Sequence, residues 1–74
     1  MMMYGIEKKE YEKIEKIVKN VGGNREKEIF SRCDMIKISM ETKEHKVYDI
    51  YAAKEADGHR DGFSIDVVTR KICG

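Results

Sequence analysis

Three stretches of this chain alternate apolar and polar residues, and this alternation limits the possible fold more than any other feature. They are MIKISM (35–40), KVYDIYAAK (46–54) and FSIDVVTRKI (63–72). Successive side chains of a strand point to opposite faces, so each stretch predicts a strand with one buried face. The short polar segments between them favour an antiparallel meander.

Residues 7–21 have the periodicity of an amphipathic helix instead. Apolar side chains recur there at spacings of three and four, namely Tyr11, Ile14, Val18 and Val21. Acidic residues lie near the start of this segment and basic residues near its end, as the helix dipole prefers. Gly22 should end the helix, and we expect it to adopt the left-handed conformation of a C-terminal cap.

Residues 24–34 allow two interpretations. Asn24 could cap a second short helix, or the same residues could lead into a long strand. With that segment left open, the chain predicts a single α+β domain over residues 1–74. We expect an N-terminal amphipathic helix packed on one face of a three-stranded antiparallel β-meander.

The expected core joins one face of the meander to the apolar stripe of the helix. A chain of 74 residues buries only about 60% of its unfolded surface, so this core should be thin. On the sheet it contains Ile36, Ile38, Met40, Tyr48, Ile50, Phe63, Ile65 and Val67. On the helix it contains Tyr11, Ile14, Ile17, Val18 and Val21.

The segment EADGHRDGFS (55–64) connects the last two predicted strands. Matching the apolar faces requires Ile65 to share a face with Ala52 or Ile50, because a slip by one residue would expose the whole apolar set. We expect Ile65 to pair with Ala52. The connection is then a two-residue turn with Gly58 and His59 at its centre, since Gly suits the first central position of a type II′ turn. Asp57 then faces Arg60.

This connection also has a sharper interpretation as a ligand loop. Asp57, His59, Asp61 and Gly62 resemble the opening of an EF-hand calcium loop, although His59 stands where Asp or Asn is usual. The resemblance ends within the segment, because Val68 lies where a bidentate Glu is required. We therefore expect no metal and no cofactor. Contact with a partner or with an anion remains open for Asp57, His59, Arg60 and Asp61.

No catalytic motif occurs in the sequence, so we expect no enzyme activity. Cys33 is expected to be a small buried hydrophobic residue, and the two histidines are predicted at opposite ends of the meander. We expect no secretion signal at the N-terminus, and no run of residues is apolar enough for a membrane span. Two cysteines in such a chain fit the reducing cytoplasm.

The second face of the predicted sheet is the better candidate for function. One helix can cover only one face, which leaves apolar residues among charges on the other. The candidate contact residues are Lys37, Asp49, Tyr51, Asp66, Val68 and Arg70. The thin core and the unpaired edges of the outer strands also favour a homodimer.

These observations predict a non-enzymatic protein-binding module that occupies a partner's surface. A composition rich in Lys, Ile, Glu and Met and without Pro suits an AT-rich genome. One expectation is therefore a phage or mobile-element inhibitor of a host defence system. The alternative is a nucleic-acid or nucleotide-binding protein that uses the sheet face and the 57–62 loop, although a net charge of +1 argues against it.

Overall fold

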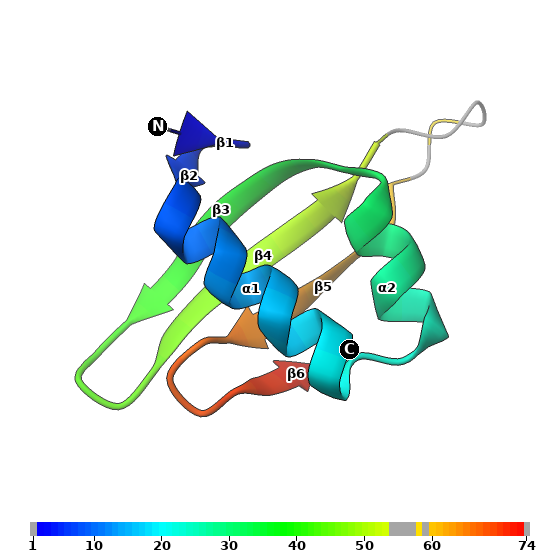
Figure 1. Ribbon diagram of the computed structural model, residues 1–74. Helices are drawn as coiled ribbons and strands as arrows, with labels where there is room; N and C mark the ends of the chain where they lie inside the picture. The colour runs from blue at the N-terminus through cyan, green and yellow to red at the C-terminus, as the bar shows by residue number, and fades with distance from the viewer. Residues whose placement is uncertain (1, 54–57, 59, 74) are drawn as a thin grey trace.

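The computed structural model describes residues 2–53, 58 and 60–73. It confirms the α+β class, with two helices and a four-stranded antiparallel sheet whose strands follow chain order. The helices cover one face of this sheet, and a small N-terminal hairpin lies beside its first strand (Figure 1). The elements are β1 (Met2–Met3), β2 (Ile6–Glu7), α1 (Lys8–Val21), α2 (Asn24–Ser31), β3 (Cys33–Glu41), β4 (Lys46–Ala52), β5 (Gly62–Asp66) and β6 (Lys71–Cys73).

The two helices follow one another with only Gly22 and Gly23 between them. The left-handed conformation predicted for Gly22 is wrong, because its φ of −75° and ψ of 145° are extended. Glycine is needed there for closeness instead, since a Cβ would lie 2.5 Å from the carbonyl oxygen of Val18. Residues 24–31 form the helix α2, whose Glu26 carboxylate accepts the Gly23 N–H at 2.8 Å.

The third predicted strand is in fact a hairpin, so the meander has four strands and not three. β5 ends at Asp66, whose carboxylate accepts the backbone N–H groups of Val68 at 2.9 Å and Thr69 at 3.2 Å. Arg70 then takes the left-handed conformation, with φ of 59°, before β6 begins. An Asp side chain that binds the main chain ahead of it favours a turn, and this local effect overrides the apolar alternation.

The predicted register between β4 and β5 is also wrong. Ile50 faces Phe63 and Tyr48 faces Ile65, whereas Ile65 was expected opposite Ala52. Both registers keep the same residues on the same face, so the apolar pattern alone does not choose between them. β4 ends at Ala52 and β5 begins at Gly62, and the turn predicted at Gly58 and His59 lies partly outside the described residues.

Strand β3 contains two β-bulges, one between Cys33 and Met35 and one between Ile38 and Met40. An extra residue in one strand changes the face on which the following residues lie. Ile38 faces Tyr48, but Met40 faces Val47 and so lies on the open face. The expected burial of Ile38 and Met40 is wrong, because they are 50% and 46% exposed.

The core otherwise follows the expected faces. Ile14, Ile17 and Val18 of α1 pack on the sheet, but Val21 is 56% exposed and is not part of the core. Tyr11 and Val67 are only partly buried against it. Cys33 is buried, as predicted. The expected core did not include Ile6, Ile29 and Ala52, which are also buried.

Candidate functional site

The first candidate site is the outer edge of β3. This strand pairs with β4 on one side only, and the tip of the β1–β2 hairpin approaches its other side. Tyr4 and Gly5 form that tip with φ values of 55° and 98°, and the Tyr4 carbonyl accepts the Ile36 N–H at 3.1 Å. The main-chain N–H and C=O groups of residues two apart in a strand point to the same side. Ile38 therefore presents its N–H and C=O to the side on which Ile36 meets Tyr4. Within the described residues, no backbone group from that side pairs with it.

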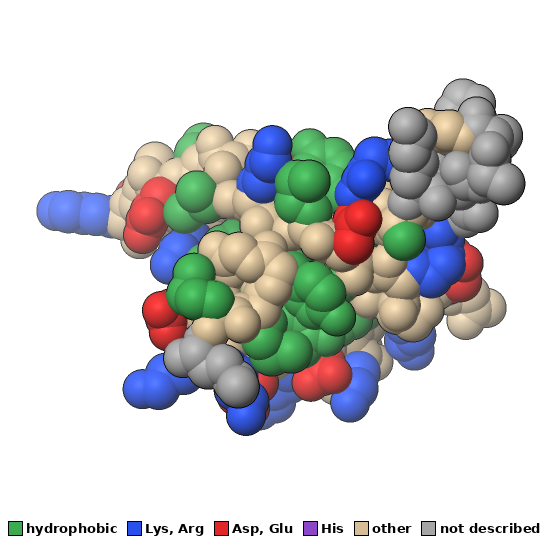
Figure 2. Space-filling view, turned by 90° about the horizontal axis from the view of Figure 1, so that it is seen from above, with side chains coloured by type: hydrophobic (Ala, Val, Ile, Leu, Met, Phe, Trp, Pro, Cys, Tyr) green, Lys and Arg blue, Asp and Glu red, His purple; other side chains and the backbone are tan. Residues whose placement is uncertain are grey.

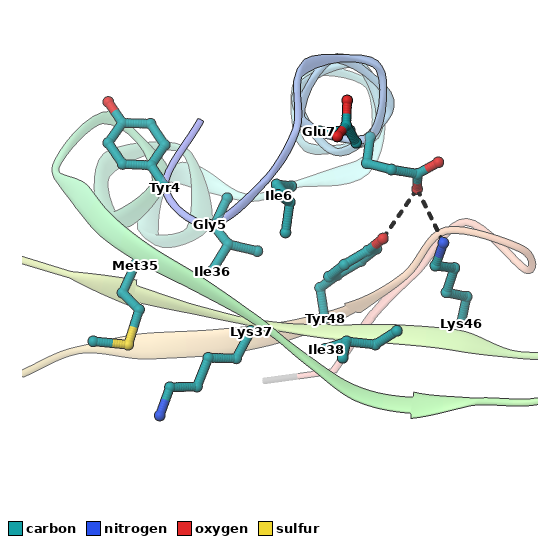
Figure 3. A pocket seen from close by; sticks show the side chains of 11 residues that line it. Tyr4, Gly5, Ile6, Glu7, Met35, Ile36, Lys37, Ile38, Lys46 and Tyr48 are labelled. Atoms are coloured by element: carbon teal, nitrogen blue, oxygen red, sulfur yellow. Dashed lines mark hydrogen bonds and ion pairs between the residues drawn. The ribbon is translucent and has the colours of Figure 1, made fainter. Parts of the chain in front are cut away.

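A groove of about 700 Å³ lies beside this edge, between the hairpin tip, the start of α1 and Ile36–Ile38 of β3. Figure 3 shows Ile6 and Tyr48 on the helix side of the sheet, whereas Met35 and Lys37 point to the opposite side. Figure 2 looks down onto this edge and shows hydrophobic side chains gathered in its middle, with charged side chains around them. The groove therefore combines free main-chain groups with an apolar lining.

The polar wall of this groove is a network around Glu10. Its carboxylate accepts the Tyr48 hydroxyl at 3.1 Å and forms ion pairs with Lys13 at 3.3 Å and Lys46 at 3.7 Å (Figure 3 shows the Tyr48 and Lys46 contacts). Burial alone would raise the pKa of Glu10, but the hydrogen bonds from Lys13 and Tyr48 and the charge of Lys46 together lower it. Burial raises the pKa of Tyr48, so the phenol stays protonated and donates. The network holds the wall in place.

The open face of the sheet brings together three of the residues predicted for partner contact. Lys37 faces Asp49 across β3 and β4, and Tyr51 faces Met35 two pairs further along, on the same face. Asp49 accepts the Ser64 hydroxyl at 2.7 Å. A shallow depression of about 440 Å³ includes Asp49 and Tyr51 in its lining. Lys37, Asp49 and Tyr51 thus form one surface, as the sequence predicted.

Asp66 does not belong to that surface. Its side chain is buried, and its carboxylate binds His45 Nδ1 at 2.7 Å and the Lys46 N–H at 3.3 Å in addition to the turn that follows it. Burial alone would raise the pKa of Asp66, but these hydrogen bonds outweigh burial and hold its pKa well below the usual range. Asp66 therefore ties the β3–β4 turn to the β5–β6 turn and is not free to contact a partner.

Val68 and Arg70 also lie apart from Lys37, Asp49 and Tyr51. They are in the β5–β6 turn, where they border a groove against α1. The pairing of Ile65 with Ala52 would place Asp49 opposite Val68 and Val47 opposite Arg70, but Asp49 faces Ser64 and Val47 faces Asp66. Of the six predicted contact residues, three lie on the open face, two lie in the β5–β6 turn, and Asp66 is buried.

The predicted contact loop lies only partly within the described residues. Arg60 pairs with Asp34 of β3, and Asp61 accepts from Arg32 at 3.4 Å. Asp57 and His59 lie outside the described residues. Nucleic-acid or nucleotide binding stays a prediction, but Tyr48 is only 3% exposed and cannot stack on a base.

The described residues offer no cluster of three His, Cys, Asp or Glu side chains that could hold a metal ion. Cys33 is buried, and burial raises the pKa of its thiol to about 11, so it is a poor nucleophile near neutral pH. No helix in the described part of the chain is long and apolar enough to cross a membrane.

Comparisons with protein-family models, with curated proteins and with solved structures find no match to this chain. Neither of the two grooves was predicted from the sequence. The only local sign of the β3 groove is Gly5 after Tyr4, between Met3 and Ile6, which is the kind of pair that a tight hairpin turn accepts. Strands of only two residues are too short for an alternation to be seen.

Proposed function

We propose that this protein is a protein-binding module that takes up an extended segment of a partner along the edge of β3. The observation that supports it is the unpaired main chain of Ile38 beside the 700 Å³ groove. In strand addition, main-chain hydrogen bonds supply affinity and side-chain pockets supply specificity. The edge of β3 offers main-chain groups for hydrogen bonds, and the groove offers an apolar pocket for side chains.

An extended segment suits this edge better than a helix does, because the free groups belong to a strand. Ile38 adds a half-exposed apolar side chain to the contact. Lys37 projects from the opposite face and forms no ion pair within the described residues, so it is available to a carboxylate of the bound segment. The bulge after Ile38 restricts regular pairing to a short stretch, which discourages open-ended stacking of copies.

A module of this kind acts by covering a surface that its partner needs. Inhibition of a host defence system by a phage or mobile-element protein is one role of that type. The amino-acid composition, which suits an AT-rich genome, supports it. A homodimer through the same edge would use the same Ile38 groups, so self-association and partner binding would compete. The molar mass in solution across a range of concentrations measures that self-association.

The test compares two substitutions at one residue. Ile38→Pro removes the N–H that faces the free edge and leaves the β3–β4 ladder, because proline is tolerated where its missing N–H would point away from the sheet. Ile38→Ala keeps the N–H and removes most of the side chain. The probe is a displayed library of short unstructured peptides, selected on the wild-type protein and measured against both variants.

We expect the selected peptides to bind the Pro variant about tenfold more weakly, since one hydrogen bond is worth about 0.5–1.5 kcal/mol and the ring crowds the incoming strand. The Ala variant should lose less. Hydrogen exchange of the Ile38 amide should slow when a peptide binds the wild type. Peptides that bind the Pro variant as tightly as the wild type, or a library that yields no binder, would overturn strand addition.

A further inference from the structure

A second groove, of about 550 Å³, lies between α1 and the β5–β6 turn. Its floor is apolar, with Ile17 and Val21 from the helix and Val67 and Val68 from the turn. Val21 and Val68 are 56% and 51% exposed, so the floor is open to solvent. Exposed aliphatic side chains that meet in a groove are typical of a contact surface.

The rim of this groove is cationic. Lys13, Lys16, Lys46 and Arg70 line it together with a single carboxylate, that of Glu10. Glu10 already pairs with Lys13 and Lys46. Lys16 and Arg70 form no ion pair within the described residues. Two uncompensated positive charges therefore border the apolar floor.

The groove is held in a fixed shape before anything binds. The Asp66 carboxylate accepts backbone N–H groups from both Val68 and Thr69 and binds His45, so the turn is tied to the neighbouring hairpin. Arg70 has a φ of 59°, a left-handed conformation that suits Gly or Asn better than Arg. A turn fixed in this way presents the Arg70 charge at a set position beside α1.

We propose that this groove binds an acidic amphipathic peptide segment of a partner protein. Its carboxylates would lie against Lys16 and Arg70, and its aliphatic side chains would lie on Val21 and Val68. No aromatic side chain lines the groove in the described part of the chain, which disfavours the base stacking that single-stranded nucleic acid uses. This groove has a different floor from the groove at β3, although Glu10 and Lys46 line both, and the proposal does not depend on strand addition at β3.

The first experiment measures which chemistry the groove selects. The probe is a short fluorescein-labelled peptide of glutamate and leucine, compared with a peptide of glutamine and leucine and with one of glutamate alone. Fluorescence anisotropy should show binding of the first peptide only. The affinity should fall as salt is added, since exposed charge pairs are screened.

The second experiment removes the two free charges. Lys16→Gln keeps a good helix former, and Arg70→Asn keeps a residue that accepts the left-handed conformation, so the double variant should fold. We expect it to bind the glutamate–leucine peptide about three- to tenfold more weakly, because exposed ion pairs are individually modest. Lys9→Gln with Lys43→Asn is the matched control, because these exposed lysines do not line the groove.

Several results would overturn this site. They are equal binding of the glutamine–leucine peptide, an equal loss in the control variant, and tighter binding of an oligothymidylate or of anionic phospholipid vesicles than of the acidic peptide. The Ile38→Pro variant should bind the acidic peptide as the wild type does. That result separates a failure of this groove from a failure of strand addition at β3.

Discussion

The two faces of the sheet are built from the same strands and have opposite roles. On the face covered by the helices, Ile50 and Ile65 are fully buried. On the open face of the same strands, Val47, Asp49 and Tyr51 are only half-buried. In this small domain the buried face of each strand supplies the stability, so the open face can carry polar and charged side chains.

The largest expected difference between the faces is in packing. Ile50→Ala should lower the free energy of unfolding by about 2–5 kcal/mol, because it leaves a cavity in a closed core. Val47→Ala, on the open face of the same strand, should cost well under half of that. Chemical denaturation of both variants measures the difference. If the Ala variant does not fold, Ile50→Val can be compared with Val47→Ala instead, and it should lower the free energy of unfolding by about 0.5–1.5 kcal/mol. Equal losses at the two positions would contradict this division of the faces.

A smaller effect is expected at Asp66, whose carboxylate joins the β3–β4 turn to the β5–β6 turn. The pKa of Asp66 lies below its unfolded value of about 3.9, so its contribution to stability is fully present above that pH and is lost as the pH falls toward the folded pKa. The difference in thermal midpoint between the wild type and Asp66→Asn should therefore shrink in acid. A difference between the wild type and Asp66→Asn that stays constant down to strongly acidic pH would contradict the role of the charge.

The smallest effect is expected where the bulge in β3 moves a residue from one face to the other. Met40→Thr should change the free energy of unfolding by less than about 0.5 kcal/mol, because Met40 lies on the open face. Ile36→Thr, four residues earlier on the covered face, should be strongly destabilising, since it places a hydroxyl in the core. Urea midpoints of the two variants check this. A large loss for Met40→Thr would place Met40 in the core after all.

The sequence predicted the parts of the fold that depend on periodicity. The helix of residues 8–21 and the burial of Ile50, Phe63 and Ile65 follow from spacing alone, because burial of an apolar face decides the element. The break after Asp66 could not be predicted that way. It depends on one side chain binding the main chain ahead of it, and the apolar alternation continues through the turn without a sign of it.

The candidate sites were predicted less well for a related reason. Lys37, Asp49 and Tyr51 lie together because their alternation is regular and the two strands pair directly. Val68 and Arg70 were assigned to the wrong surface because their position depends on the turn and on the register. Two registers that conserve the same buried face cannot be told apart by hydrophobicity. Non-local pairing of this kind is visible only in the folded chain.

Glu10 and Lys46 line both grooves, so the two grooves share a wall. A ligand in one groove that draws Lys46 away from Glu10 changes the surface offered by the other. Thermodynamic linkage makes such an effect reciprocal, since each ligand must alter the affinity for the other by the same factor. One ion pair, 3.7 Å long, would in this way couple the two proposed binding events without a change of fold.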